Sequence, residues 1–124
     1  MVGHDEVEIL MVEDSPIELR HMVSVLSSRG YKIVTAADGD EALAKAASAR
    51  PDVVLLDIVL PKTNGFQVCR QLKHSPATKN IKVLLVTGKT QESDRFWGMK
   101  QGADGYLTKP YRADELTSMV ERYL

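Results

Sequence analysis

The sequence predicts an α/β fold, in which a five-stranded parallel sheet carries helices on both of its faces. Five short apolar or β-branched runs recur along the 124 residues, and segments with helical periodicity separate them. Strict alternation of strand and helix implies parallel strands joined by right-handed crossovers. We therefore expect one doubly wound (βα)5 domain that spans residues 1–124.

The strands are expected where apolar and β-branched residues cluster. The five predicted strands cover residues 8–12, 32–36, 53–57, 82–87 and 105–108.

The first predicted helix opens with a capping box. Ser15 can cap the helix, Glu18 follows three residues later, and Pro16 takes the first helical position. Gly30 marks the end of this helix. Apolar residues recur at helical spacing between these signals, at Leu19, Met22, Val23 and Leu26.

Four further helices follow from spacing and stop signals. The second covers residues 40–49 and stops before Pro51, the third covers 65–73, and the fourth covers 91–101. In the fourth, Phe96, Met99 and Ala103 fall on one side, and Met99 is expected in the core. The last helix sets apolar residues at helical spacing, at Leu116, Met119, Val120 and Tyr123.

Composition excludes several classes of protein. Apolar residues make up 44% and charged residues 27%, with a net charge of -1, so no basic field favours direct binding of nucleic acid. The apolar runs are too short for membrane insertion, and the polar, acidic residues 1–6 do not resemble a signal peptide. We expect a cytoplasmic protein. The single cysteine, Cys69, excludes an internal disulfide and a CxxC motif.

Three acidic residues directly follow predicted strands. Glu13 and Asp14 come after the first strand, and Asp57 ends the third. Because parallel strands gather their carboxyl ends at one edge, these carboxylates should meet in one pocket. So dense a negative charge is unfavourable without a cation, and Mg2+ accepts such hard oxygen ligands. The sequence therefore predicts a Mg2+ site.

A hydroxyl and an ammonium group are expected at the same edge. Thr87 ends the fourth strand and Lys109 follows the fifth. A carboxylate can attack phosphorus, while a hydroxyl and an ammonium can balance charge on the transferred oxygens. The set favours phosphoryl transfer to an aspartate.

Four motifs at the strand ends carry a family resemblance. They are E-D-S-P at 13–16, D-I-V-L-P-K-T-N-G at 57–65, V-T-G at 86–88 and Y-L-T-K-P at 106–110. Together they resemble the receiver domain of two-component response regulators. The resemblance implies a flavodoxin-like fold with strand order 2-1-3-4-5. It also implies that Asp57 takes a phosphoryl group from a phosphohistidine, on a sensor histidine kinase or a histidine phosphotransfer domain.

The same resemblance assigns metal ligands. Asp14 and Asp57 match the carboxylates that bind Mg2+ directly, and Glu13 would act through a coordinated water. The backbone carbonyl of Val59 would supply another ligand. The family acts as a signalling phosphoacceptor, which catalyses only its own phosphorylation and dephosphorylation and is not an enzyme in the ordinary sense. Glu13 stands where aspartate is more usual, a change that a water-mediated ligand tolerates.

The resemblance further implies a conformational switch. Thr87 matches the hydroxyl that moves to the phosphoryl group, and Lys109 would pair with another phosphoryl oxygen. Lys109–Pro110 matches a cis peptide bond. Tyr106 matches an aromatic residue that turns inward when Thr87 moves, so that phosphorylation biases a two-state equilibrium.

The surface formed by the fourth helix, the fifth strand and the last helix is the expected output face, where a downstream protein would bind. Five of the seven aromatic residues lie in this part of the chain, and aromatic residues are common at binding hot spots. They are Phe96, Trp97, Tyr106, Tyr111 and Tyr123. Val59 and Lys89 should flank the path of water to the phosphorus, and we hypothesise that they set the lifetime of the phosphorylated state.

The sequence disfavours two other functions. A haloacid-dehalogenase-like phosphatase needs a second acid two residues after its nucleophile, where this chain has Val59. A flavin or dinucleotide carrier needs a glycine-rich phosphate cradle after the first strand, where this chain has acids. Residues 92–110 resemble stand-alone receivers from the chemosensory systems that control type IV pilus twitching motility.

Overall fold

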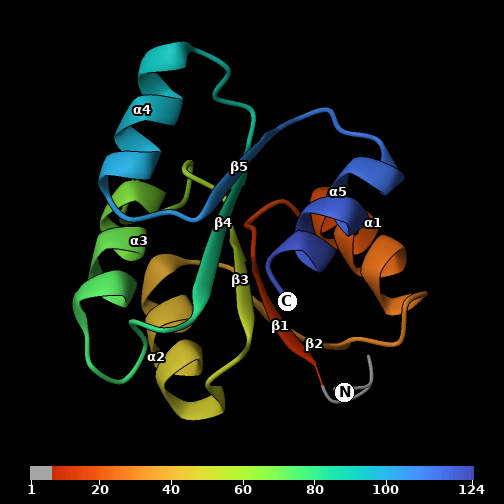
Figure 1. Ribbon diagram of the computed structural model, residues 1–124, viewed down its shortest axis with the longest axis horizontal. Coiled ribbons are helices and arrows are strands. Elements are labelled where there is room, and N and C mark those ends of the chain that lie inside the picture. The colour runs from red at the N-terminus through yellow and green to blue at the C-terminus, as the bar shows by residue number, and fades with distance from the viewer. Residues whose placement is uncertain (1–6) are drawn as a thin grey trace.

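Five strands alternate with five helices in the computed structural model, which describes residues 7–124 (Figure 1). Residues 1–6, whose polar and acidic sequence does not resemble a signal peptide, lie outside the described residues. The elements are β1 (Glu8–Val12), α1 (Pro16–Ser27), β2 (Lys32–Ala36), α2 (Gly39–Ala49), β3 (Val53–Leu56), α3 (Gly65–His74), β4 (Lys82–Thr87), α4 (Glu92–Lys100), β5 (Gly105–Thr108) and α5 (Ala113–Arg122).

The sheet is parallel throughout, and its strand order is β2-β1-β3-β4-β5. This confirms the predicted fold class and strand order. Figure 1 shows α1 and α5 on one face of the sheet and α2, α3 and α4 on the other. Val12 pairs with Leu56, so the residues that follow β1 and β3 leave the sheet next to each other.

Alternate residues of each strand supply two hydrophobic cores, because side chains alternate between the faces of a sheet. Leu10 and Val12 pack with α2 and α3, while Ile9 and Met11 pack with α1 and α5. The strand side chains of both cores are fully or almost fully buried. The sheet is therefore a rigid platform for the loops at its carboxyl edge.

Side-chain caps fix where α1 and α2 begin. The Ser15 hydroxyl accepts a hydrogen bond from the Glu18 amide at 3.4 Å, as the sequence predicts. The Asp38 carboxylate accepts from the Glu41 amide at 2.8 Å, which starts α2 at Gly39, one residue before the predicted start. At the other end of α1, which ends at Ser27, Gly30 takes a positive φ of 84°.

Helix α4 is the element whose packing differs from prediction. Gly98 is its only buried residue, whereas Phe96 and Met99 are 57% and 45% exposed. The expectation that Met99 lies in the core is wrong. A Cβ built on Gly98 would lie 2.6 Å from Leu85 Cδ1, so the helix backbone itself meets the sheet there and turns its larger side chains outward.

No helix within residues 7–124 combines the length and apolar character needed to cross a membrane.

Candidate functional site

Two carboxylates lie side by side at the carboxyl edge of the sheet. The Glu13 amide donates to the Ala36 carbonyl at 3.0 Å, and the Asp57 amide donates to the Val12 carbonyl at 3.2 Å. These bonds hold Glu13 and Asp57 just past the ends of β1 and β3. Both residues are buried, at 2% and 6% exposure. Buried acids need a positive partner, and the structure supplies one.

That partner is Lys109, which follows β5. Its amide donates to the Thr87 carbonyl at 2.8 Å, and its peptide bond to Pro110 is cis. Its ammonium donates to Asp57 Oδ2 at 2.8 Å and also to Glu13 Oε1. A third bond, of 3.1 Å, runs to Glu18 Oε2 from the first turn of α1. The three N–H donors of the ammonium thus face three carboxylates.

The acids form a candidate metal centre. One oxygen from each of Glu13, Glu18 and Asp57 lies within 4.8 Å of the others, which makes a set of hard oxygen donors that fits Mg2+. The predicted ligand Asp14 is exposed and does not belong to this set within the described residues, so its role as a ligand stays a prediction. The Val59 amide donates to Asp57 Oδ1 at 3.1 Å, which brings the loop of Val59 to the site.

Burial and charge shift the titration of this cluster. Burial raises the pKa of the Glu13 carboxyl to about 7, against the opposing effect of its hydrogen bond from Lys109. Burial alone would lower the pKa of Lys109, but hydrogen bonds to Asp57 and Glu13 raise it above its usual range. Lys109 is therefore a permanent positive charge at the site.

Thr87 and Tyr106 are linked through the loop after β4. Thr87 is fully buried, and its hydroxyl accepts from the Lys89 amide at 3.3 Å. Tyr106 is 7% exposed, and its hydroxyl donates to the Lys89 carbonyl at 2.7 Å. Burial raises the pKa of this phenol to about 12. The structure thus places both predicted switch residues in contact with the backbone of the same residue, Lys89, with the tyrosine ring turned inward.

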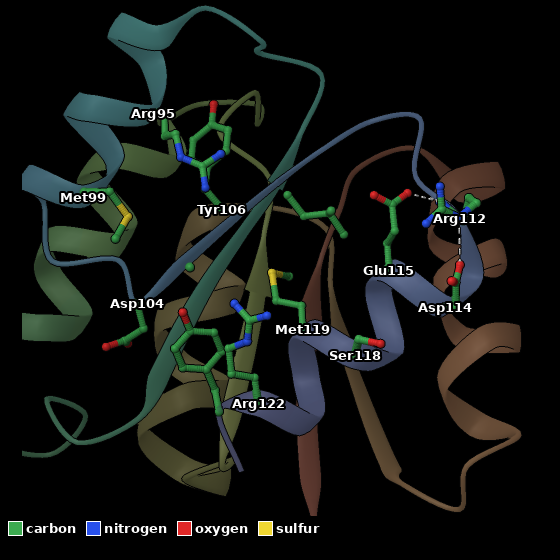
Figure 2. A pocket seen from close by; sticks show the side chains of 13 residues that line it. Arg95, Met99, Asp104, Tyr106, Arg112, Asp114, Glu115, Ser118, Met119 and Arg122 are labelled. Atoms are coloured by element: carbon green, nitrogen blue, oxygen red, sulfur yellow. Dashed lines mark hydrogen bonds and ion pairs between the residues drawn. The ribbon is translucent and has the colours of Figure 1, made fainter.

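A groove runs beside Tyr106, between α4 and α5 (Figure 2). Its volume is about 390 Å³, and Met99 on α4 and Met119 on α5 both contribute to its lining. The guanidinium of Arg95 lies 5.5 Å from the centroid of the Tyr106 ring, at one end of this groove. The ring therefore has a cation on its groove side.

The predicted aromatic residues divide by exposure. Phe96 and Trp97 lie exposed on α4, with ring centroids 6.2 Å apart. Tyr111 and Tyr123 are half-buried, and Tyr111 lies 5.7 Å from the ring of His21 on α1. The exposed pair adds apolar surface to α4, as expected for an output face.

Sequence reasoning missed one residue of the site, Glu18. The capping box predicts that the Glu18 carboxylate turns back to the Ser15 amide. In the structure that amide donates to Glu13 Oε2 at 3.1 Å instead, and the Glu18 carboxylate reaches Lys109. Its place on the first turn after β1, at the edge where the other acids gather, is the signal that could have identified it.

Comparison with known proteins agrees with this geometry. The family model described as response regulator receiver domain matches residues 9–121. Protein PilH of Pseudomonas aeruginosa is 43% identical over 116 residues, which cover 94% of this chain and 96% of PilH. Protein PilG of the same organism is 32% identical over 120 residues, which cover 97% of this chain and 89% of PilG.

Solved structures give the same result. The chemotaxis protein CheY4 of Vibrio cholerae superposes with a TM-score of 0.89 at 34% identity, covering 95% of this chain and 98% of CheY4. The receiver domain of a sensor histidine kinase from Pseudomonas aeruginosa superposes with a TM-score of 0.88 at 30% identity, covering 94% and 96% of the two chains. That crystal structure has a magnesium ion coordinated in its active-site cleft.

Proposed function

This chain belongs to the family of response regulator receiver domains, and from that premise we propose that Asp57 accepts a phosphoryl group from a phosphohistidine. The donor is a sensor histidine kinase or a histidine phosphotransfer domain. The observation that carries the proposal is the environment of Asp57: a buried carboxylate at the sheet edge, bonded to the Lys109 ammonium at 2.8 Å.

Asp57 is the nucleophile in this proposal. One of its oxygens forms a bond to phosphorus as the phosphorus–nitrogen bond of the donor breaks, and the imidazole leaves with that electron pair. The Lys109 ammonium balances charge on the transferred oxygens. The Val59 amide, 3.1 Å from Asp57 Oδ1, holds the carboxylate in a fixed orientation.

Mg2+ is the proposed cofactor. Asp14, Asp57 and the Val59 carbonyl would hold the ion directly, with Glu13 acting through a water molecule. When bound, the ion supplies positive charge next to the transferred phosphoryl oxygens. The acidic oxygens of Glu13 and Asp57 at the sheet edge support this assignment.

Thr87 and Tyr106 are the proposed switch. A movement of the Thr87 hydroxyl toward the phosphoryl group breaks its bond from the Lys89 amide, and the Lys89 carbonyl holds the Tyr106 hydroxyl. Phosphorylation therefore acts on the ring through the backbone of Lys89, whose amide bonds to Thr87 and whose carbonyl bonds to Tyr106. It shifts the two-state equilibrium only by the difference in its interaction energy with the two states.

The downstream partner is proposed to bind the face formed by α4, β5 and α5. The exposed Phe96 and Trp97 and the groove between α4 and α5 support this surface. The similarity to PilH and PilG favours a role in a pilus-type chemosensory system in the cytoplasm. Signalling in this proposal needs neither direct binding of nucleic acid nor insertion into a membrane.

Acetyl phosphate tests the proposal, since it replaces the kinase as donor. Incubation with acetyl phosphate and Mg2+ is expected to add one phosphoryl group to the wild type, in an acid-stable and base-labile bond. Asp57→Asn is expected to abolish the adduct in intact-protein mass spectra. The matched control is Asp52→Asn, because Asp52 directly precedes β3 whereas Asp57 directly follows it. This variant should keep the adduct. An adduct that persists in Asp57→Asn contradicts the proposal.

A further inference from the structure

The ammonium of Lys109 lies among the acids of the cluster, and two of them, Glu13 and Asp57, belong to the proposed Mg2+ site. It bonds to Glu13, Glu18 and Asp57, the same three residues whose oxygens lie within 4.8 Å of one another. An ammonium and a divalent cation repel each other at such distances. Mg2+ beside Glu13 and Asp57 therefore favours a position of the Lys109 ammonium farther from these two carboxylates.

Glu18 differs from the other two partners of Lys109. Its side chain is 47% exposed, whereas those of Glu13 and Asp57 are 2% and 8% exposed. Glu18 thus lies on the outer side of the cluster. Its carboxylate is also released from helix capping, because the Ser15 amide bonds to Glu13 Oε2.

We propose that Glu18 is a positioning residue, which receives the Lys109 ammonium as it leaves Glu13 and Asp57 and so makes room for Mg2+. This inference rests on the proposed function. The bond of 3.1 Å between Lys109 Nζ and Glu18 Oε2 already exists, so the ammonium shifts within its set of partners and never loses a counter-charge.

Removal of the Glu18 charge is expected to weaken Mg2+ binding. In Glu18→Gln the Lys109 ammonium has only Glu13 and Asp57 as charged partners, and it competes with the ion for both. Loss of a nearby negative charge acts in the same direction and accounts for roughly tenfold by itself in a water-like dielectric, so the two effects together should raise the Mg2+ dissociation constant more than tenfold.

Glu121→Gln is a closely matched control. Glu121 is 45% exposed and forms an ion pair of 3.1 Å with Arg29, but it lies on α5 outside the acid cluster. Isothermal titration calorimetry with Mg2+ alone should give wild-type affinity for this variant. An equal loss in Glu121→Gln and Glu18→Gln would trace the effect to overall charge and overturn the inference.

A double-mutant cycle separates positioning from direct metal ligation. In a Lys109→Met background there is no ammonium to receive, so Glu18→Gln should lose only the charge effect and should weaken Mg2+ binding less than it does in the wild type. A loss in that background as large as in the wild type makes Glu18 a ligand or a bare charge and overturns the positioning role. Lys109→Gln serves for the same cycle if Lys109→Met does not fold.

Failure of the inference and failure of the proposed function give different results. A wild type that binds no Mg2+ removes the proposed metal cofactor, and with it the basis of the inference. A wild type that binds Mg2+ no better than Glu18→Gln removes the inference alone.

Discussion

The substitution Gly65→Ala tests how closely α3 supports the loop of Asp57. A Cβ on Gly65 would lie 2.2 Å from the backbone oxygen of Asp57 and 2.6 Å from the Cα atom of Ile58. An ordinary contact begins at 3.4 Å, so the first residue of α3 and the loop must separate by 3.4 minus 2.2, or about 1.2 Å. Both sides of the clash are main chain, which no rotamer change relieves.

The expected cost follows from two opposing effects. Overpacking against backbone costs about 3 kcal/mol, at the upper end of the usual range. Alanine recovers roughly 0.5–1 kcal/mol over glycine in a helix, because it restricts the unfolded chain. Gly65→Ala should therefore lower the free energy of unfolding by about 2 kcal/mol and the melting temperature by about 8 °C for a domain of this size.

Urea unfolding and thermal melts measure this loss, with Gly88→Ala as the control. A Cβ on Gly88 has no atom within 4 Å, so that variant should stay within about 0.5 kcal/mol of the wild type. Because Gly65 contacts the backbone of Asp57, its variant should also accept a phosphoryl group more slowly. Wild-type stability in Gly65→Ala would refute the tight packing of α3 on this loop.

Three more predictions concern the site itself. Val59→Asn and Lys89→Glu each place a group that can bind the attacking water beside Asp57, so autodephosphorylation should quicken up to roughly tenfold in each; unchanged rates in both would remove the idea that these positions set the lifetime. Tyr106→Phe loses the 2.7 Å bond to the Lys89 carbonyl and should cost about 1 kcal/mol in urea unfolding; no loss would mean that this bond does not hold the ring. The pKa of Glu13 rises from 4.5 to about 7 on folding, so in metal-free buffer its stabilising contribution is full below pH 4.5 and is lost as the pH approaches 7. Unfolding free energies across this range should fall less in Glu13→Gln, and an identical pH dependence in both proteins would contradict the shift.

Local sequence signals predicted most of the fold because its strands are short and rich in apolar residues, and β1, β3 and β4 are almost entirely buried. The predicted strands match β1, β2, β4 and β5. The third strand ends at Leu56 rather than at Asp57, although the Asp57 amide still bonds to the Val12 carbonyl. Boundaries of this kind depend on geometry that a run of apolar residues does not encode.

The features that the sequence did not predict depend on contacts between segments that lie far apart in the chain. The role of Glu18 depends on which of two carboxylates takes the Ser15 amide, and Glu13 takes it from the end of β1. The exposure of Met99 depends on how closely the backbone of Gly98 approaches Leu85. In both cases the outcome depends on a contact with a residue of another segment, and helical spacing alone does not describe that contact.

A crystal structure with Mg2+ and beryllofluoride tests the central claim most directly, because beryllofluoride mimics a phosphoryl group on a carboxylate. We expect it on an Asp57 oxygen, with Mg2+ contacting Asp14 and Asp57 and with the Lys109 ammonium and the Thr87 hydroxyl turned toward it. A free Asp57, or an ion bound away from that carboxylate, would contradict the assignment of Asp57 as the phosphoryl acceptor.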